Sequence, residues 1–244
     1  MNRTTIALRH WLRTLGITPV LARVMNRVGL FGGAEGYEER FAERMFEELR
    51  EGDIVWEVGA NVGLYTREFC HRVGGAGRVI AFEPTPVCYE KLNANCESEI
   101  GQNCETHQLA LGASDGEVEM QLADDPLGAT HSVLTEEQKL AGAKTIAVEM
   151  VRGETLAQDR GMPRPNFLKV DVEGSELDVF QGLGGLLAEE GCRAIFCEVH
   201  FGLLAERGQP YASQEIEKLL AESGLSQQEW LDASHLMALR PEAG

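Results

Sequence analysis

Residues 53–63 read Asp-Ile-Val-Trp-Glu-Val-Gly-Ala-Asn-Val-Gly, an apolar run that ends in an acid and a glycine-rich turn. Such a turn suits a nucleoside pocket, because small residues let the backbone approach a ligand and the N–H groups of the next helix point into the same space. A second apolar run at 78–82 ends in another acid, Glu83, about 20 residues after Gly63, a spacing at which a carboxylate can reach a ribose diol. The stretch therefore predicts a nucleoside site at the ends of two adjacent strands of an α/β sheet.

The chain contains 244 residues, of which 43% are hydrophobic and 25% are charged. This length and composition suit one well-buried α/β domain with room for a small appendage. Acidic residues outnumber basic ones by 39 to 22, and the formal net charge is −17. Binding to a nucleic-acid backbone requires clustered Lys and Arg, so we expect no nucleic-acid partner and favour a small-molecule, glycan or lipid substrate.

Residues 1–34 differ from the rest because they contain arginines and no acidic residue. Their apolar residues recur at roughly helical spacing, interrupted at Gly16 and Pro19, so we expect two short amphipathic helices. No apolar run is long enough for a signal-peptide core or a ~20-residue membrane span. The segment could lie on an anionic membrane or cover an apolar substrate, but we favour packing on the chain's own acidic domain or on a second subunit of a homodimer. The predicted organisation is a basic N-terminal arm over residues 1–36 and a catalytic domain over residues 37–244.

The six cysteines form no Cys-x-x-Cys pair. Because no secretory segment is recognisable, we expect reduced and mostly buried thiols in a cytoplasmic protein. Cys88, Cys96 and Cys104 are evenly spaced, but zinc sites usually contain closer pairs, so we predict no metal bound by cysteine.

Apolar runs and helical patterns alternate along most of the chain, which predicts a mostly parallel sheet with helices on both faces. After the first two strands, we expect strands at 104–109, 166–170 and 193–199, and a terminal antiparallel hairpin of 228–231 and 236–240. Helices are expected at 38–50, 64–73, 85–95 and 213–223, with one more that Ser175 and Asp178 cap and that ends near residue 182. Polar groups at the carboxyl ends of the parallel strands are then placed where open α/β sheets bind ligands.

The alternation breaks over residues 112–150, where strands are expected at 117–122 and 145–151 with a long loop between them. We interpret this segment as an inserted hairpin near the pocket. Long loops in compact domains are usually functional or disordered. This loop carries His131, a candidate contact to the substrate, although a solvent-exposed histidine is the more common outcome.

The glycine turn alone does not choose between NAD and another nucleoside cofactor. The dinucleotide fingerprint is G-x-G-x-x-G, and the turn at residues 59–63 lacks the third glycine. Glu57 lies two residues before the first glycine, where it repels a pyrophosphate and attracts a cation. A ligand with a positive amino group beside a ribose and an adenine fits this arrangement, so we favour S-adenosylmethionine.

Four motifs follow one another in the chain: E-V-G-A-N-V-G at 57–63, A-F-E-P at 81–84, K-V-D-V-E-G-S-E at 169–176 and E-V-H at 198–200. In this ordered set the sequence resembles the FkbM-type S-adenosylmethionine-dependent methyltransferases, over roughly residues 50–240. The resemblance implies a Rossmann-like, seven-stranded class I methyltransferase sheet whose last strand is antiparallel to the rest. It also implies O-methylation of a hydroxyl on a sugar, polyketide or related small molecule. Glu57 replaces the commoner Asp, which changes how the methionine amino group is held.

The expected cofactor contacts gather around the first two strand ends. Glu57 is assigned to the methionine amino group, residues 59–63 to close backbone approach, and Glu83 to the ribose. The full predicted set is Glu57, Gly59, Ala60, Asn61, Gly63, Glu83, Pro84, Ala110, Leu111 and Asp171.

An alkyl hydroxyl has a pKa of roughly 15.7, like water, so it needs a base or a metal ion before it accepts a methyl group. The catalytic candidates follow the fourth and fifth strands and are Lys169, Asp171, Glu173 and His200, with Glu198 as a substrate contact. We favour metal-free catalysis with His200 or Asp171 as the base, because the fifth strand carries no adjacent Asp-Asp or Asp-Asn pair. Mg²⁺ bound by Asp171, Glu173 and a later acid is the alternative. Lys169 could instead pair with Glu198, and Glu173 could hold its loop at the start of the next helix.

Two other functions fit parts of the pattern. A nucleic-acid methyltransferase is expected to end its fourth strand in an N/D-P-P-aromatic segment, whereas residues 171–174 read Asp-Val-Glu-Gly. A module that binds S-adenosylmethionine without catalysis keeps the pocket and lacks turnover.

Overall fold

The computed structural model describes residues 35–97, 103–121, 132–133 and 145–242. The predicted helices of the basic N-terminal arm, His131 and most of the long loop of the insert lie outside these residues. Among the helices in the described ranges, none is both long and apolar enough to cross a lipid bilayer.

The centre of the fold is a seven-stranded sheet with the strand order β3–β2–β1–β8–β9–β11–β10. Its strands are β1 (Ile54–Val58), β2 (Arg78–Phe82), β3 (Cys104–His107), β8 (Phe167–Val170), β9 (Ala194–Glu198), β10 (Gln227–Trp230) and β11 (His235–Leu239). All of them run parallel except β11, which pairs antiparallel with both β9 and β10. The predicted mostly parallel sheet with an antiparallel last strand is confirmed.

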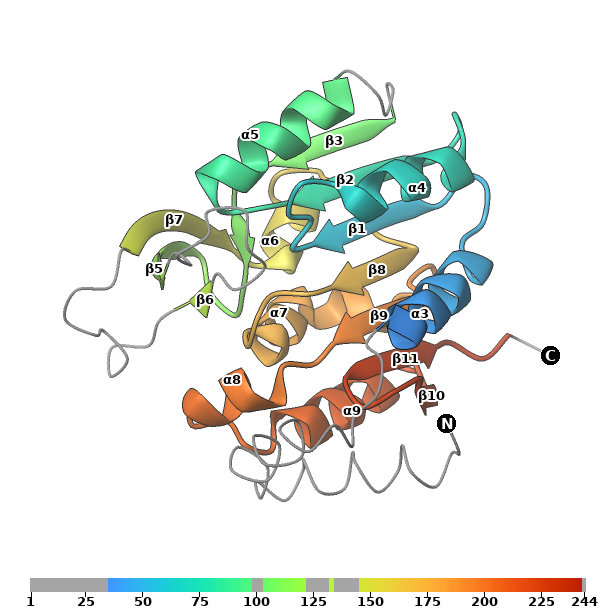
Figure 1. Cartoon of the computed structure of the whole chain (residues 1–244). Coiled ribbons are helices and arrows are strands. Elements are labelled where there is room, and N and C mark those ends of the chain that lie inside the picture. Colours follow the sequence, from blue (N-terminus) through green and yellow to red (C-terminus); the bar gives the residue numbers. More distant parts are fainter. Residues whose placement is uncertain (1–34, 98–102, 122–131, 134–144, 243–244) are drawn as a thin grey trace.

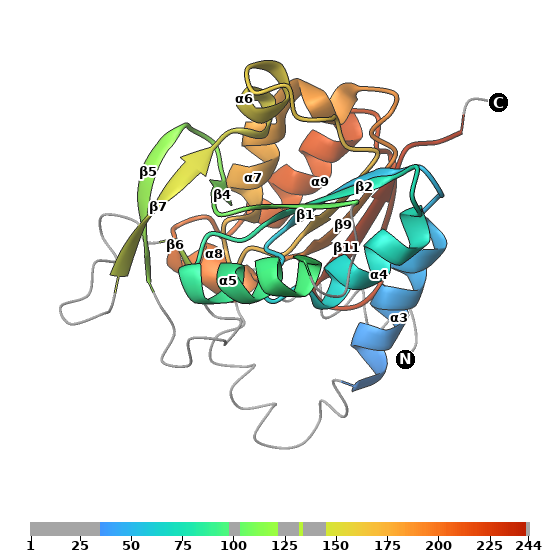
Figure 2. The same cartoon turned by 90° about the horizontal axis from the view of Figure 1, so that it is seen from above.

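Helices cover both faces of this sheet (Figure 1, Figure 2). One face carries α3 (Glu35–Glu47), α4 (Leu64–Val73) and α5 (Pro86–Asn95), and the other carries α6 (Gly153–Gln158), α7 (Glu176–Leu183) and α9 (Ala212–Glu222). A short 3-10 helix, Gly184–Ala188, follows α7, and α8 (Phe201–Glu206) follows β9. Because both faces are covered, every residue of β8 is buried, as expected for a central parallel strand.

Most predicted elements agree with the structure to within a few residues, and the differences have local causes. The helix expected at 38–50 begins at Glu35 and ends at Glu47. The strand expected at 104–109 ends at His107, because Ala110–Leu111 leaves the main sheet and forms β4 in a second one. The sequence predicts neither α6 nor α8, since six residues are too few to show a helical period.

The predicted capping of α7 by Ser175 and Asp178 is wrong. Ser175 occupies the N-cap position, but its side chain makes no capping hydrogen bond within the described chain. Its Oγ accepts a hydrogen bond from Arg207, which also donates to Asp178 at 2.6 Å. A distant arginine therefore overrides the local capping signal and ties the end of α8 to the start of α7.

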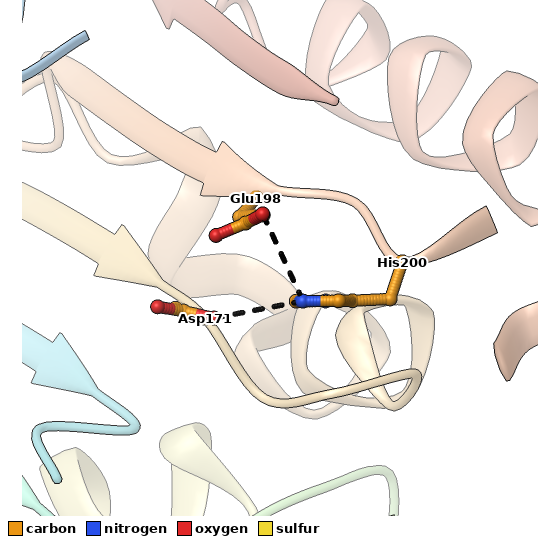
Figure 3. A group of neighbouring side chains, drawn as sticks. All are labelled: Asp171, Glu198 and His200. Atoms are coloured by element: carbon orange, nitrogen blue, oxygen red, sulfur yellow. Dashed lines mark ion pairs between the residues drawn. The ribbon is translucent and has the colours of Figure 1, made fainter. Parts of the chain in front are cut away.

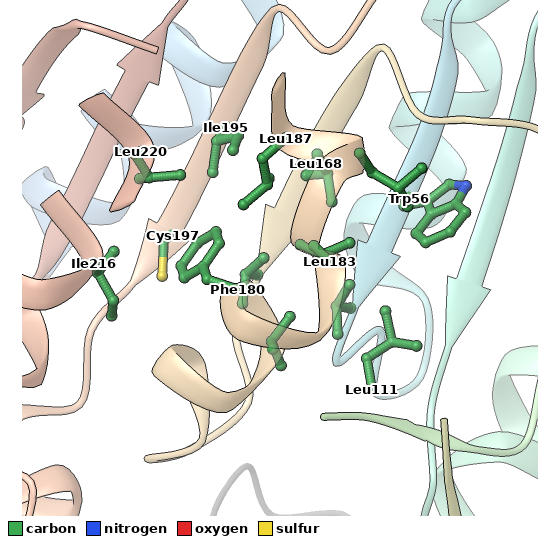
Figure 4. Close-up of a cluster of buried hydrophobic side chains, with 14 of the residues drawn as sticks. Trp56, Leu111, Leu168, Phe180, Leu183, Leu187, Ile195, Cys197, Ile216 and Leu220 are labelled. Atoms are coloured by element: carbon green, nitrogen blue, oxygen red, sulfur yellow. The ribbon is translucent and has the colours of Figure 1, made fainter. Parts of the chain in front are cut away.

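Two apolar layers hold the sheet between its helices. On the side of α7 and α9, Phe180 of α7 packs in one cluster with Leu168 of β8 (Figure 4). On the other side, the ring of Phe167 lies 6.0 Å from that of Phe69 and 5.4 Å from that of Phe196, measured between centroids. Burying a large apolar side chain stabilises the fold by roughly 1.5–3 kcal/mol. These layers fix the strands and therefore the positions of the polar residues that follow them.

A second, four-stranded sheet in the order β4–β7–β5–β6 lies beyond the carboxyl ends of β1 and β8 (Figure 1). Its strands are β4 (Ala110–Leu111), β5 (Gly116–Gln121), β6 (Ser132–Val133) and β7 (Thr145–Val151). The antiparallel pairing of β5 with β7 confirms the inserted hairpin. Gly182 of α7 meets the start of this sheet, because a Cβ there would be 1.8 Å from the carbonyl oxygen of Gly112. Only glycine allows this approach between the second sheet and the core.

We expect Gly182→Ala to lower the free energy of unfolding by about 1–3 kcal/mol, because the added methyl group collides with backbone. Gly202→Ala is the matched control. Gly202 is exposed on α8, and a Cβ there meets no atom of the described residues within 4 Å. Alanine at this helical position should be neutral or stabilising by up to about 1 kcal/mol. Urea-induced unfolding compares the two variants, and equal stabilities would contradict the close packing of α7.

Candidate active site

The ends of β1, β2 and β8 and the second sheet enclose a cleft of about 680 Å³, part of it open to solvent. It brings together most of the residues predicted to contact the cofactor, namely Gly59, Asn61, Glu83, Pro84, Ala110, Leu111 and Asp171. Glu57, Ala60 and Gly63 lie outside its lining. The lining also contains residues that the sequence did not point to, Phe82, Cys88, Leu109, Met120 and Val172. Phe82 and Met120 lie in strands, Cys88 lies in α5, and Leu109 and Val172 lie close to strands. Apolar residues at such positions look like core in a sequence, so their type alone does not mark them as lining.

The glycine turn after β1 is shaped by contacts within the protein. Gly59 has a φ of +83°, and a Cβ on it would lie 1.8 Å from the carbonyl oxygen of Asp171. Its N–H group and that of Ala60 both donate to the carbonyl of the last residue of β2, at 3.0 Å. The N–H of Asn61 donates to Oε2 of Glu83 at 2.9 Å. These three N–H groups are used inside the protein, whereas the N–H groups that the sequence places toward a ligand are those at the start of the next helix, α4.

Glu83 is held firmly at the edge of the cleft. Its Oε1 accepts hydrogen bonds from the N–H (2.9 Å) and the Oγ1 (2.5 Å) of Thr85, and its Oε2 accepts one from Asn61. A carboxylate offers about four acceptor sites, so Oε2 keeps capacity for a further hydroxyl donor. This geometry suits the predicted contact between Glu83 and a ribose diol.

Glu57 is fully buried, with one carboxylate oxygen hydrogen-bonded and the other without a partner. Its Oε2 accepts from Oγ1 of Thr66 at 2.5 Å, whereas Oε1 has no hydrogen-bond partner among the described residues. Burial raises the pKa of Glu57 to about 7, although the charge of Lys169 and the Thr66 hydrogen bond lower it. Oδ1 of Asn61 is likewise buried without a partner in the described chain. Buried acceptors without partners are uncommon, and these two suit a ligand that brings N–H donors and positive charge.

Lys169 is a buried cation that neighbours Glu57 in the register of β1 and β8. Its Nζ lies 3.1 Å from Oδ2 of Asp171 and 4.9 Å from the ring centroid of Tyr65. Burial lowers the pKa of Lys169, but the charges of Asp171 and Glu57 outweigh this effect and raise it. Lys169 therefore stays protonated and pairs with Asp171, whereas the alternative considered from the sequence paired it with Glu198. A permanent cation here stabilises carboxylates and does not accept a proton.

Three carboxylates surround the Nε2 atom of His200 where β8 and β9 end, two of which are drawn in Figure 3. Nε2 lies 3.3 Å from Glu173, 4.0 Å from Asp171 and 3.9 Å from Glu198. The other ring nitrogen, Nδ1, lies 2.6 Å from Oε1 of Glu176 and donates to it. The structure thus brings together four of the polar residues that the sequence placed after the fourth and fifth strands.

The pKa values in this cluster follow from burial and from neighbouring charges. Burial lowers the pKa of His200, but its hydrogen bond to Glu176 and the surrounding carboxylates raise it overall to about 9. Burial raises the pKa of Glu173 to about 7 in spite of the charge on His200. Burial also acts to raise the pKa of Asp171, but the charges of Lys169 and His200 hold it below its usual value. At neutral pH, His200 is therefore protonated and Asp171 is ionised.

Glu176 and His235 belong to the same network, although the sequence assigned no role to either. Glu176 is fully buried, and its Oε1 also accepts the N–H of His200 at 3.2 Å. Nε2 of His235 lies 3.5 Å from Oε2 of Glu198, and its Nδ1 lies 2.7 Å from Asp232. The one sequence feature that could have pointed to a role for Glu176 is its place as the last residue of the motif at 169–176. No local pattern marks His235, because β11 reaches Glu198 only through the order of the strands.

A sequence profile described as a methyltransferase FkbM domain matches residues 57–226. The chain belongs to the FkbM methyltransferase family. Hexuronic acid methyltransferase AglP of Haloferax volcanii is 30% identical over 189 residues, which cover 78% of this chain and 70% of that protein. The 31-O-demethyl-FK506 methyltransferase FkbM of Streptomyces tacrolimicus is 27% identical over 231 residues, with 76% and 88% covered. A crystal structure of Aeropyrum pernix fibrillarin aligns over 82% of this chain and 73% of the fibrillarin chain. The TM-score is 0.47 and the sequence identity is 12%, so this likeness is too distant to bear on function.

Membership confirms the prediction of an S-adenosylmethionine-dependent methyltransferase. When bound, this cofactor supplies a methyl group on a sulfonium and carries a cationic amino group and a ribose. The residues in and beside the cleft fit it, since Asn61 of the lining and Glu57 outside it keep buried acceptors without partners among the described residues, and Glu83 presents a fixed carboxylate. The individual contacts stay predictions.

We expect the affinity for S-adenosylmethionine to fall about tenfold between pH 8 and pH 6. With a pKa of about 7, Glu57 is mostly ionised at pH 8 and mostly protonated at pH 6. A neutral carboxyl attracts the cationic amino group less, so binding at pH 6 should release a proton. Calorimetry in buffers with different ionisation enthalpies measures both the affinity and the released proton.

Glu57→Gln should bind the cofactor about tenfold more weakly at pH 8 and lose most of this pH dependence. Glu90→Gln removes a carboxylate from the exposed face of α5 and should behave like the unmodified chain. If Glu57→Gln kept the full pH dependence, another group would have to be the one that titrates.

Proposed function

We propose that this methyltransferase transfers the methyl group of S-adenosylmethionine to a hydroxyl of a glycan or another small molecule. Two relatives support this class of acceptor, since one is named a hexuronic acid methyltransferase and the other a 31-O-demethyl-FK506 methyltransferase. The observation that carries the proposal is the position of Asp171. This residue lines the cofactor cleft and also lies in the polar cluster around His200. It therefore lies between the proposed donor pocket and side chains that can accept or donate a proton.

On the donor side, the proposed contacts divide between polar and apolar groups. Glu57 holds the amino group of the methionine part, and Glu83 holds the ribose. Ala110 and Leu111 of β4 are buried side chains of the cleft lining, and Pro84 adds a rigid edge. Apolar walls of this kind exclude water from the reacting groups and hold the nucleoside in one orientation.

On the acceptor side, the hydroxyl must lie in line with the methyl group and must lose its proton. Asp171 is ionised at neutral pH, and Lys169 holds its Oδ2 at 3.1 Å. His200 has a pKa of about 9, so it must first lose a proton before it can act as a base. Of the two bases suggested by the sequence, we therefore favour Asp171, with Glu173 and Glu198 orienting the acceptor.

We expect Asp171→Asn to lower kcat for methyl transfer by about 10²–10⁴-fold, the usual contribution of a general base. Binding of S-adenosylmethionine should persist, because Glu57 and Glu83 remain. Asp159→Asn makes the same charge change at the exposed end of α6 and should leave kcat unchanged. Formation of S-adenosylhomocysteine, followed by mass spectrometry, measures turnover. Full turnover by Asp171→Asn would contradict its assignment.

The acceptor class is tested with isotope-labelled S-adenosylmethionine and a panel of uronic-acid glycans, neutral glycans, lipids, hydroxylated polyketides and nucleic acids. We expect the label on a hydroxyl of a glycan or small molecule. Transfer to nucleic acid alone would contradict the proposal. Cofactor binding without transfer to any member of the panel would favour a binding protein without catalysis.

The same proposal covers the organisation of the whole chain. Residues 1–36 form the basic N-terminal arm, which packs on the acidic catalytic domain of residues 37–244 or on a second subunit, and the enzyme works in the cytoplasm. His131 in the insert is proposed to contact the acceptor. We expect the full chain to stay unbound in flotation with anionic liposomes, because the arm is already covered. Flotation with the liposomes would instead assign the arm to a membrane surface.

A further inference from the structure

Asp171, Glu198 and His200 together offer three ligand atoms for a metal ion, all within 4.8 Å of one another (Figure 3). Asp171 follows β8, while Glu198 ends the neighbouring strand β9 and His200 comes two residues later, so paired strands fix their backbone. Ligand atoms bound to one ion at about 2.0–2.3 Å lie about 3–4.5 Å from each other. Nε2 of His200 lies 4.0 Å from Oδ1 of Asp171 and 3.9 Å from Oε1 of Glu198, which is within that range.

His200 and Asp171 each bond a neighbouring side chain through one polar atom, and the other polar atom of each faces the space between the three candidate ligands. Nδ1 of His200 donates to Glu176 at 2.6 Å, so Nε2 is the nitrogen that faces the carboxylates. Oδ2 of Asp171 accepts from Lys169 at 3.1 Å, so Oδ1 is the oxygen that faces His200. Histidines that bind metals usually donate their other nitrogen to a carboxylate or carbonyl, which fixes the tautomer and the ring.

Glu198 is oriented in the same way from the side of β11. Its Oε2 lies 3.5 Å from Nε2 of His235, and Nδ1 of that ring is held by Asp232 at 2.7 Å. Its other oxygen, Oε1, is the one that faces His200. Three side chains from two segments thus direct their remaining atoms to one place, and side chains that bond the ligands of a metal site from outside orient those ligands in this way.

The charges around this centre are mostly negative. Glu173 adds a third carboxylate 3.3 Å from Nε2 of His200, and Glu176 adds a fourth at Nδ1. Like charges at such distances repel each other unless a cation lies among them. Lys169 is bonded to Asp171 on the side away from His200, through its other oxygen. A cation among the carboxylates offsets this repulsion, and it is either the protonated ring itself or a metal ion bound to its Nε2.

We propose that Asp171, Glu198 and His200 bind one divalent cation of the Mn²⁺ type, since one imidazole nitrogen and two carboxylate oxygens suit such an ion. The inference rests on the proposed function in one respect, because the acceptor hydroxyl takes one of the remaining coordination positions, becomes more acidic there and gives its proton to the carboxylate of Asp171 as the methyl group leaves the sulfonium. It departs from our expectation of metal-free catalysis. That expectation looked for adjacent acids on a single strand, whereas the structure brings the three ligands together from the ends of two neighbouring strands, β8 and β9.

The test is a titration of the full chain with Mn²⁺ alone, after treatment with a chelator and dialysis, with free Mn²⁺ measured by electron paramagnetic resonance. We expect one bound Mn²⁺ per chain. Glu198→Gln and His200→Gln should each raise Kd at least tenfold, and Glu176→Gln should raise it about 10–100-fold through the orientation of the ring. Glu206→Gln, at the exposed end of α8, is the matched control and should bind Mn²⁺ like the unmodified chain.

Binding of S-adenosylmethionine by the same variants shows that they are folded. Absence of Mn²⁺ binding by the unmodified chain below about 1 mM overturns the inference and leaves the protonated ring as the cation. An unchanged Kd in both Glu198→Gln and His200→Gln also overturns it. The titration needs no acceptor, so a failed search for O-methylation does not affect its result, and a metal-free chain that methylates hydroxyls leaves the proposed function intact.

Discussion

The site depends on the interaction of the buried ammonium group of Lys169 with two carboxylates, those of Glu57 and Asp171. Lys169 neighbours Glu57 across β1 and β8 and lies 3.1 Å from Asp171. Burying a carboxylate without an opposite charge costs on the order of several kcal/mol, and here one cation offsets two carboxylates. The charge on Lys169 lowers the pKa of Glu57, the proposed contact to the methyl donor, and that of Asp171, the proposed base, so one cation favours the ionised form of both.

The pairing of Lys169 with Glu57 and Asp171 requires the backbone that follows β1 to pack closely against the backbone that follows β8. The contact is made by Gly59, whose missing side chain leaves room for the carbonyl oxygen of Asp171. A larger residue would push the end of β8 away and move Asp171 from Lys169. The glycine in the motif is therefore needed for contact between the ends of the two strands.

The sequence could predict the features that depend on short-range patterns. The buried run at 79–82 and the glycine turn define strand ends, because a covered parallel sheet needs apolar strands and a tight turn needs residues with positive φ. It could not predict partners that meet through the fold. Glu176 reaches His200 only after α7 packs beside the end of β9, and His235 reaches Glu198 only because β11 lies next to β9. These partners decide the protonation of the cluster, so its chemistry could not be derived from spacing.

The charge of the acidic cluster also links the metal proposal to the choice of acceptor. Four carboxylates around His200 attract cations and repel anions, which agrees with a cationic methyl donor and opposes nucleic acid. A neutral sugar or polyketide hydroxyl can enter such a site without a further cation. An acceptor that carries its own carboxylate, such as a uronic-acid glycan, is repelled unless a divalent ion lies between the two sets of acids. A requirement for a metal should therefore be stronger for anionic acceptors than for neutral ones, because the ion must then neutralise charge as well as acidify the hydroxyl.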